Sequence, residues 1–345
     1  MSPADERRFC IAMLPKVSRT FAACIRLLPQ PVQHQVLIAY LLCRVADTAE
    51  DTAELPVPVK EALLASFSAR LADDLPADDW RTTFTPFTAM PQRRIHDEEL
   101  AREADAVLNE FRRLSPAARD AIRPWVQEMC HGMASFAAKH ARARPDHLEA
   151  LDSVEELDRY CYYVAGTVGH LLTDLFCLHS GRFTPEHRER LKALSTSFGV
   201  GLQLTNIIKD VADDRRRGWS FVPRQLCRLA NIDPEDLCDT RHMAESHRVM
   251  EQLIRKARRH LHDALRYCCA LPRSQYGIRL FCLTPLYFAV RTLAVAERDQ
   301  RLLDPDHKVK ITRGDVYRTL CMAHVVAPSN HLVRSYYRQL VGKRR

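Results

Sequence analysis

Two acidic motifs stand out in this 345-residue chain because each lies inside an apolar, helix-patterned segment. One spans residues 47–51 and the other spans residues 206–214. Ionised carboxylates in apolar surroundings cost free energy unless a partner compensates their charge. In a helix, several of these side chains lie one turn apart and so line one face. They are Asp47 and Asp51 in the first motif, and Asn206, Asp210 and Asp214 in the second.

Two such faces pointing at each other would form a pocket of oxygen ligands for magnesium, Mg²⁺, which can hold and ionise a diphosphate. Carboxylates gathered around one cavity repel one another, and a divalent ion offsets that repulsion. The predicted metal ligands are Asp47, Asp51, Asp210 and Asp214, with Glu50 and Asn206 as further candidates. Asp213 lies off the i, i+4 series, so its part stays open. The alternative is a pair of solvated acidic helix faces.

Composition favours a soluble, mostly helical protein. Hydrophobic residues make up 46% of the chain and charged residues 27%, which is ordinary for a globular protein. Only 10 residues are glycine, so few tight hairpins are expected. No uninterrupted run of 18 apolar residues predicts a membrane span, and the N-terminus lacks the core of a signal peptide. The 12 cysteines lack metal-binding CxxC spacing, so we expect buried, reduced thiols in a cytosolic protein.

The net charge of +8 suits an anionic partner. Apart from residues 215–217 and 343–345, however, the basic residues are scattered, which argues against nucleic acid as the partner. A diphosphate substrate or an anionic membrane surface fits better. The alternative is that most of these residues belong to solvated helix faces.

Helical periodicity indicates one all-α bundle. The windows are 32–53, 116–140, 154–179, 185–214, 243–269, 277–297 and 313–327. Ser115 and Thr184, each followed by proline, are typical of helix starts, and Ser153 with Glu156 predicts a capping box. The segment 73–92 is the expected loop. Because no long linker divides the chain, we expect a single domain over residues 1–345, arranged around a central cavity.

Several segments together resemble the signatures of the squalene/phytoene synthase family. They are 18–21 with 40–51, 160–169 with 201–210, 281–285, and 309–314. Within the family, the last two segments are most similar to those of the squalene synthases. The resemblance covers about residues 16–325. It implies the all-α isoprenoid synthase (terpenoid synthase) fold and a prenyltransferase that condenses two molecules of farnesyl diphosphate head to head.

The resemblance also implies roles for individual residues. The substrate-binding positions are Arg19, Phe21, Tyr40, Arg44, Gln203, Asn206, Lys209 and Phe281. Tyr160 matches the tyrosine that handles protons as the cyclopropane intermediate forms. At Lys209 relatives usually carry arginine, and where relatives often have a basic residue after the second motif this chain has Trp219, so one of Arg215–Arg217 is expected to supply that charge.

For several of these positions the alternative is a purely structural role. Arg44 would instead form a salt bridge to Asp47 or to a neighbouring helix. The aromatic side chains would be plain core residues. Small residues at 165, 166 and 169 would either leave room for a prenyl chain or permit close helix packing. We expect His170 to be structural.

Reduction of the condensed product needs a hydride donor. The chain has no GxGxxG segment after a strand, so a Rossmann domain is excluded. The resemblance to squalene synthases nevertheless implies NADPH, with Asn206, Lys310 and Arg313 as the cofactor-binding candidates. The alternative for Lys310 and Arg313 is a basic loop before the next helix.

Together with the acidic motifs, the resemblance therefore implies a squalene synthase that uses Mg²⁺ and NADPH. The closest rival is a dehydrosqualene or phytoene synthase, which needs no hydride, and a more distant one is a non-catalytic lipid-binding assembly factor. We expect a cytoplasmic monomer that contacts the inner membrane surface peripherally, through an amphipathic helix.

Overall fold

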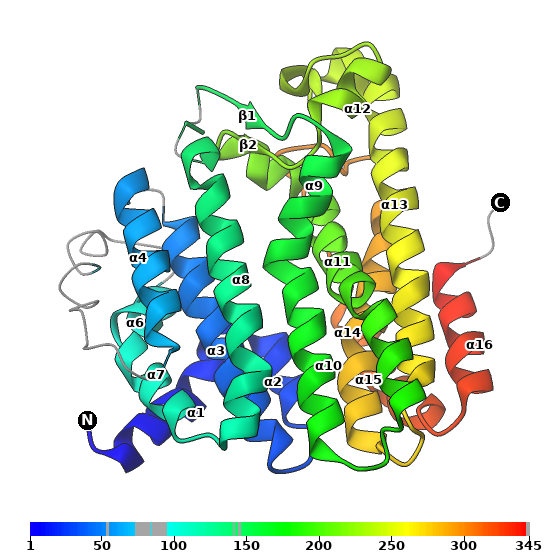
Figure 1. Ribbon diagram of the computed structural model, residues 1–345. Coiled ribbons are helices and arrows are strands. Elements are labelled where there is room, and N and C mark those ends of the chain that lie inside the picture. Colours follow the sequence, from blue (N-terminus) through cyan, green and yellow to red (C-terminus); the bar gives the residue numbers. More distant parts are fainter. Residues whose placement is uncertain (53–54, 73–83, 85–94, 141, 144–145, 343–345) are drawn as a thin grey trace. The chain divides into compact units, whose positions relative to one another are not determined.

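The computed structural model describes residues 1–52, 55–72, 84, 95–140, 142–143 and 146–342 (Figure 1), apart from the side chains of Arg19 and His140. The described chain is almost entirely helical, which confirms the all-α prediction. Contacts divide it into two compact units, and each is described by itself. The single domain and its central cavity stay predictions.

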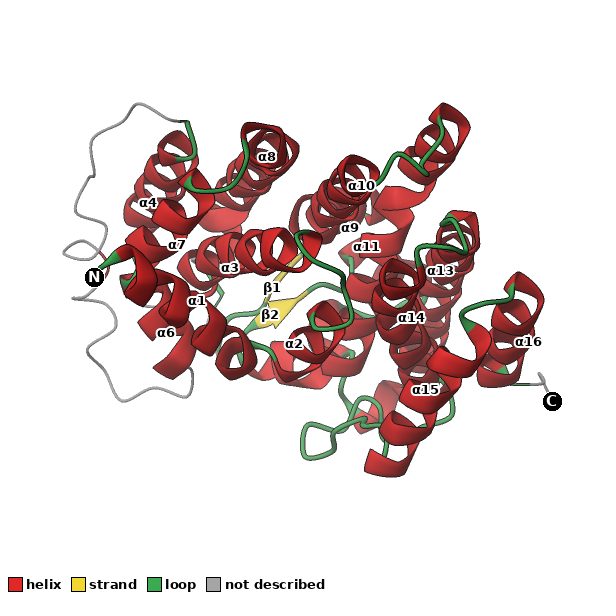
Figure 2. Ribbon diagram, turned by 90° about the horizontal axis from the view of Figure 1, so that it is seen from below, coloured by secondary structure: helices red, strands yellow, loops and turns green. Residues whose placement is uncertain are grey.

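Unit 1 comprises residues 1–141 and 170–184. Its helices are α1 (Pro3–Val17), α2 (Arg19–Ile25), α3 (Val32–Asp51), α4 (Val57–Arg70), α6 (Ile95–Arg102), α7 (Ala104–Arg112), α8 (Pro116–His140) and the later part of α10 (Thr167–His179). Helix α3 packs against α1, α4, α6, α7 and α8, and Figure 2 shows it among them. Its apolar side chains are buried on several sides, which leaves one polar stripe that includes Asp47.

Unit 2 comprises residues 142–169 and 185–345. Its elements are the strands β1 (Glu149–Ala150) and β2 (Trp219–Ser220), the helices α9 (Val154–Cys161), α11 (Pro185–Arg216), α12 (Arg224–Leu229), α13 (Met243–Ala270), α14 (Tyr276–Ala296), α15 (Arg313–Val326) and α16 (Asn330–Val341), and short turns. The two strands pair in parallel. Helix α11 runs beside α13 and also contacts α14 (Figure 1). This packing fixes the second acidic motif to the core of the unit.

The helical windows are confirmed, with observed ends within two residues of the predicted ones wherever the structure describes them. The window 154–179 differs in its interior, because a π-helix at Tyr162–Gly166 separates α9 from α10. Periodicity missed α1, α2, α4, α6, α7, α12 and α16. Except for Phe84, the predicted loop 73–92 lies outside the described residues, as do Ala53 and the terminal basic run 343–345.

The predicted helix caps are confirmed at two serines. The Ser115 hydroxyl accepts a hydrogen bond from the Ala118 N–H at 3.4 Å, and the Ser153 hydroxyl accepts one from the Glu156 N–H at 3.2 Å. The capping box is wrong in its second half, because the Glu156 carboxylate accepts from the N–H of Asp152 at 2.6 Å. Ser153 alone therefore caps α9.

Two helical stretches have the length and apolar composition of a membrane span. They are Val154–His179, with a mean hydropathy of 1.2, and Tyr276–Ala296, with 1.5. Of these windows, 56% and 83%, respectively, are buried inside the structure. Core helices pass the same test, so this is weak evidence for a span. The sequence criterion, which required an uninterrupted apolar run, predicted no membrane span, whereas the averaged hydropathy identifies these two candidate helices.

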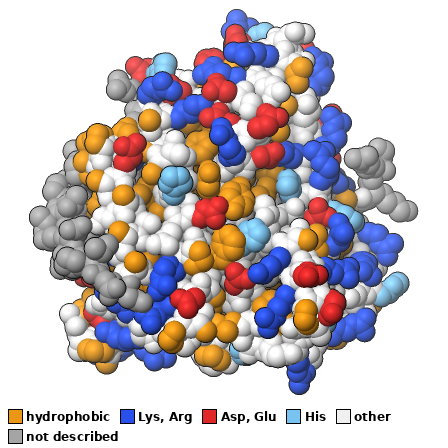
Figure 3. Space-filling view, in the orientation of Figure 1, with side chains coloured by type: hydrophobic (Ala, Val, Ile, Leu, Met, Phe, Trp, Pro, Cys, Tyr) orange, Lys and Arg blue, Asp and Glu red, His pale blue; other side chains and the backbone are white. Residues whose placement is uncertain are grey.

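Exposed arginines follow one face of α13 and account for part of the positive charge. They are Arg248, Arg255, Arg259 and Arg266. Figure 3 shows basic side chains along the edge where α13 lies. Three of the four pair within the helix, with N–O distances of 2.8 to 2.9 Å to Glu245, Glu251 and Asp263. Such exposed pairs contribute little stability. This stripe is thus a solvated helix face, which was the predicted alternative to an anion-binding surface for the basic residues.

A fully buried arginine organises the C-terminal part of unit 2. Arg279, on α14, is 0% exposed, yet its guanidinium donates to no carboxylate in the described part of the chain. It donates instead to three backbone carbonyls and to the side-chain oxygen of Asn330. The carbonyls belong to Cys268, Leu271 and Ala327. One side chain therefore ties the end of α13 to the turn between α15 and α16.

The cysteines are free thiols, and all of them except Cys43, Cys238 and Cys321 are buried. Burial raises the pKa of Cys43 to about 12 and also raises the pKa of Cys238. Cys321 is exposed. The prediction of buried, unpaired thiols is confirmed for most of the cysteines.

We expect one thiol of the native chain to react rapidly with Ellman's reagent at pH 8. The reactive species is the thiolate, and reagent reaches Cys321, which is exposed, more readily than the other cysteines, which are buried or half-buried. The substitution Cys321→Ser should abolish the fast phase, whereas Cys227→Ser, at a buried position, should preserve it. A fast phase of two or more thiols in the native chain would contradict the burial described here.

Candidate active site

The first acidic motif closes helix α3. Asp51 is the last helical residue, and the N–H of Thr52 bonds back to the Thr48 carbonyl at 3.1 Å. The Asp47 side chain is 30% exposed and Asp51 is exposed. Because the two residues lie one turn apart, their carboxylates share the open stripe of α3. The structure thus presents both as accessible oxygen donors, and their part as metal ligands stays a prediction.

Glu50 is placed differently from its two acidic neighbours. It is 1% exposed, and the buried ammonium of Lys60 on α4 donates a hydrogen bond to the Glu50 backbone carbonyl. Burial raises the pKa of the Glu50 carboxyl well above its ordinary value, and the charges of Asp51 and Asp47 raise it further. Its side chain packs in unit 1 rather than on the open stripe. Its part as a metal ligand stays a prediction.

Arg44 is held by two carboxylates. Its Nε and Nη2 donate to the two oxygens of Asp97 on α6, at 3.0 and 2.9 Å, and its Nη1 pairs with Asp47. Burial lowers the pKa of Arg44, but the charges of Asp47 and Asp97 outweigh that effect and raise it. The salt-bridge alternative for Arg44 is therefore observed. A contact with diphosphate stays a prediction, and the side chain of Arg19 lies outside the described residues.

Two aromatic rings lie beside this stripe. Phe21 of α2 and Tyr40 of α3 are half-buried, with ring centroids 5.6 Å apart. The Ser18 hydroxyl caps α2 by accepting from the Phe21 N–H at 3.2 Å, which fixes the start of that helix next to α3. Burial raises the pKa of Tyr40, although a hydrogen bond with Ser18 lowers it in part. Within unit 1, the predicted aromatic positions thus adjoin Arg44.

The second acidic motif occupies the last turns of α11. Asn206 is exposed, the Asp210 side chain is 40% exposed, and the Asp214 side chain is 7% exposed. Asp210 pairs with Lys209, and Asp214 pairs with Arg217. Accessibility thus falls along the series towards the C-terminal end of the helix. Half-buried Gln203 lies one turn before Asn206.

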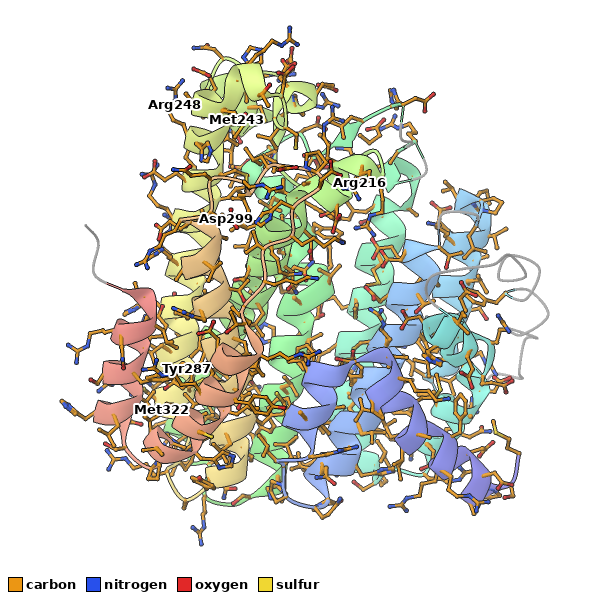
Figure 4. The ribbon with its side chains drawn as sticks, turned by 180° about the vertical axis from the view of Figure 1, so that it is seen from behind. Arg216, Met243, Arg248, Tyr287, Asp299 and Met322 are labelled. Atoms are coloured by element: carbon orange, nitrogen blue, oxygen red, sulfur yellow. The ribbon has the colours of Figure 1, made fainter. Side chains whose placement is uncertain are left out.

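A connection after α14 folds back onto this end of α11. The Lys308 ammonium lies 2.6 Å from Asp213, and Arg216 donates to the carbonyl of Pro305. Figure 4 labels Arg216 and Asp299 in this region. The hydrogen bond from Lys308 lowers the pKa of Asp213. Asp213 is thus engaged by the connection.

The cofactor candidates lie on the same connection. Lys310 is exposed, and Arg313 is the exposed first residue of α15. Lys308 anchors the connection to Asp213 only two positions before Lys310. Within unit 2, the basic segment therefore adjoins the end of the helix that carries the second acidic motif. Binding of NADPH there stays a prediction.

The three arginines after the motif have different partners. Arg215 donates to the Glu235 carbonyl at 2.6 Å, Arg216 contacts the connection, and Arg217 pairs with Asp214. Trp219 is 7% exposed in strand β2 and lies against Phe221. Among the three arginines, Arg217 therefore contacts a predicted metal ligand directly.

Tyr160 is the penultimate residue of α9, just before the π-helix. It is 5% exposed, and its ring centroid lies 4.8 Å from that of Phe221. The π-helix that follows packs on α11. Such π-segments occur often at functional sites. Phe281, in contrast, is 2% exposed on the buried helix α14, as a core residue would be.

Within unit 2, glycines bring the π-helix and the first residues of α10 very close to α11. A Cβ added at Gly199 would collide with the Ala165 carbonyl oxygen, and one added at Gly169 would collide with the Ser195 carbonyl oxygen. The small residues therefore permit close packing of backbones, which is one of the two alternatives considered. His170 stacks on Trp125 with ring centroids 4.6 Å apart, in keeping with a structural part.

We expect Gly199→Ala to destabilise the chain by about 2 kcal/mol, since alanine's better helix propensity is outweighed by overpacking against a neighbouring backbone. The control is Gly314→Ala, also at a helical position, where the nearest atom to an added Cβ is the Thr312 hydroxyl oxygen at 3.7 Å. Urea denaturation measures both variants. Equal midpoints for the two would show that the contact is not as tight as described.

The donor chemistry of the two motifs fits Mg²⁺. The accessible ligands are carboxylate and amide oxygens at Asp47, Asp51, Asn206 and Asp210, which hard divalent cations prefer. Within the described residues, no group of three or more His, Cys, Asp or Glu side chains is arranged to hold a metal ion. Each motif therefore offers a partial set of ligands, to which diphosphate oxygens would add.

Sequence reasoning missed three partners of the site residues. Asp97 binds Arg44, Lys308 pairs with Asp213, and Phe221 packs on Tyr160. The signal for Lys308 was available, because it stands two residues before Lys310 in the basic segment. No local sequence pattern identifies Asp97 or Phe221, because tertiary packing brings them to their partners.

A sequence profile described as squalene/phytoene synthase matches residues 14–315 of this chain. The squalene synthase of Eremothecium gossypii is 31% identical over 319 residues, which cover 90% of this chain and 68% of that protein. The squalene synthase of Schizosaccharomyces pombe is 30% identical, over 92% of this chain and 65% of that protein. The chain thus spans about two thirds of the length of these fungal relatives.

Solved structures are similar to this chain over nearly its whole length. The complex of TcSQS with the ligand BPH1237 matches with a TM-score of 0.78 at 26% identity, covering 96% of this chain and 90% of that one. A dehydrosqualene synthase bound to a ligand matches with a TM-score of 0.63 at 18% identity, which supports a shared fold alone. The predicted all-α architecture of this fold class is confirmed.

Proposed function

This chain belongs to the squalene/phytoene synthase family, and we propose that it is a squalene synthase, a prenyltransferase that joins two molecules of farnesyl diphosphate and reduces the product with NADPH. The observation that carries the proposal is the pair of acidic helix faces. Asp47 and Asp51 on α3, and Asn206 and Asp210 on α11, present accessible oxygen donors at one-turn spacing.

The acidic residues act in the first half of the reaction. Mg²⁺, when bound, coordinates the diphosphate oxygens as a Lewis acid and makes diphosphate a leaving group. In this proposal Asp47, Asp51, Asp210 and Asp214 would hold the ion, with Glu50 and Asn206 as further candidate ligands. Arg44, fixed by Asp97, adds positive charge next to Asp47. These residues position the donor substrate so that ionisation occurs at C1.

Apolar and aromatic residues act next. The double bond of the second farnesyl diphosphate attacks C1 of the allylic cation, and proton loss gives presqualene diphosphate. Phe21 and Tyr40 exclude water and offer ring faces to the cation. Tyr160, held by the ring of Phe221, is the residue proposed to handle the proton.

The second half needs another ionisation, a rearrangement and a hydride. NADPH, when bound, supplies that hydride. Lys310 and Arg313 are exposed cations that suit the nucleotide phosphates, and the pairing of Lys308 with Asp213 keeps their segment beside the end of α11. This neighbourhood supports placing reduction beside the second acidic motif.

The test is incubation of the purified chain with farnesyl diphosphate and Mg²⁺, with and without NADPH, followed by mass-spectrometric identification of the hydrocarbon. We expect squalene only when NADPH is present. The same hydrocarbon in equal yield without NADPH would replace the proposal by a dehydrosqualene or phytoene synthase. No release of diphosphate under any condition would favour a non-catalytic relative.

We also propose a cytoplasmic monomer that touches the inner membrane surface peripherally. The proposal is supported by the apolar prenyl chains of the proposed substrate and product, which favour a membrane. The net charge of +8 also suits an anionic lipid surface.

A further inference from the structure

A small pocket lies in unit 2, and none of its lining residues belongs to either acidic motif. Helices α14, α15 and α16 form it, and they pack on one another in pairs. Figure 4 labels Tyr287 on α14 and Met322 on α15 in this part of the unit. The lining residues are Arg291, Asp315, Arg318, Thr319, Tyr336, Gln339 and Leu340. None of them has a part in the proposed function, so the pocket is argued independently of it.

The pocket carries a surplus positive charge. Arg291 pairs with Asp315 at 2.9 Å, and Asp315 also caps α15 by accepting from the N–H and hydroxyl of Thr312. This pair is therefore neutral overall and fixed in place. Arg318 is exposed and forms no ion pair with any residue that the structure describes. The guanidinium of Arg318 is thus available to bind an anion.

Two largely buried residues contribute hydroxyl groups to the same lining. Thr319 is 2% exposed and Tyr336 is 4% exposed. Neither hydroxyl makes a hydrogen bond to another group in the described part of the chain. The Tyr336 ring is held edge-on by Tyr287, with centroids 5.0 Å apart. Neither hydroxyl oxygen is among the fully buried, unpartnered atoms of the described chain, so both open onto the pocket and can donate to a ligand there.

We propose that this pocket binds a phosphate group. Its volume of about 90 Å³ exceeds what a single water needs. A guanidinium and two hydroxyls are donors that suit a phosphate, and arginine binds phosphate through parallel N–H groups. The group could be free phosphate or the headgroup of an anionic lipid. Tyr317, 70% exposed next to Arg318, gives the second source an apolar contact.

The first arm of the test uses inorganic phosphate. The melting temperature of the full chain is followed against phosphate concentration, in EDTA and at constant ionic strength. We expect Arg318→Gln to weaken the apparent affinity at least fivefold and Thr319→Val about threefold. Arg334→Gln is the matched control, since it removes the same charge from an exposed position on α16 outside the lining.

The second arm uses vesicles of phosphatidylcholine with and without phosphatidic acid. If the headgroup is the source, sedimentation with the acidic vesicles should fall at least fivefold in Arg318→Gln but not in Arg334→Gln. A loss specific to Arg318 in either arm supports the pocket and identifies its source. Equal behaviour of the wild type and both arginine variants in both arms would overturn it, whatever the enzyme assay shows.

Discussion

The substitution Asp210→Asn is expected to slow diphosphate release from farnesyl diphosphate about 1000-fold, with little change in melting temperature. Asp210 has the most accessible carboxylate of the second motif's i, i+4 series, and it pairs with the adjacent Lys209. The amide keeps the shape of the side chain but removes the charge that a divalent cation needs. The measurement is diphosphate release at saturating Mg²⁺, together with the Mg²⁺ concentration required for half activity.

Asp263→Asn is the matched control for this variant. Asp263 belongs to the same unit, its side chain is 35% exposed against 40% for Asp210, and it too pairs with a nearby basic residue. It should retain near-normal activity. If the two variants lost activity equally, the effect at Asp210 would be one of general charge, and the metal assignment would fail.

The substitution Arg279→Met is expected to cost at least about 3 kcal/mol of unfolding free energy, the largest stability effect we predict. It leaves the carbonyls of Cys268, Leu271 and Ala327 buried without their donor. It also removes the 2.7 Å bond to Asn330, which itself donates to Cys269 at 2.9 Å. The end of α13 and the turn between α15 and α16 therefore lose the side chain that connects them. Denaturant unfolding monitored by circular dichroism measures the loss.

Arg273→Met serves as the control here, because Arg273 is exposed and makes no hydrogen bond to a described residue. Its unfolding free energy should change by less than about 0.5 kcal/mol. Arg279→Lys should fall between the two, since an ammonium keeps the charge but cannot span the same four acceptors. A loss below about 1 kcal/mol for Arg279→Met would mean that the network contributes little.

Local periodicity predicted the parts of the site that depend on spacing along one helix. The one-turn intervals from Asp47 to Asp51 and from Asn206 to Asp210 follow from 3.6 residues per turn once the segments are helical. Their accessibility follows too, since the apolar residues between them occupy the buried sides of α3 and α11. Both motifs could therefore be identified from the order of the amino acids alone.

Features that depend on contacts between distant segments could not be predicted. The burial of Glu50 follows from the packing of α3 on α4, where Lys60 is buried, and the sequence of α3 alone does not contain it. Likewise, Arg279 lies within an apolar window that predicts only a core helix. Its acceptors come from chain segments up to 51 residues away.

The π-helix between Tyr160 and Gly169 implies a constraint on chain length. The N–H of Thr167 bonds to the carbonyl of Tyr162, which accommodates one residue more than an α-helical turn would. Deleting a single residue there would restore a regular α-helix with Tyr160 and Gly169 near their present orientation about the axis, whereas inserting one more would turn them by about 100° relative to each other. A single-residue deletion in this stretch should therefore be tolerated better than a single-residue insertion.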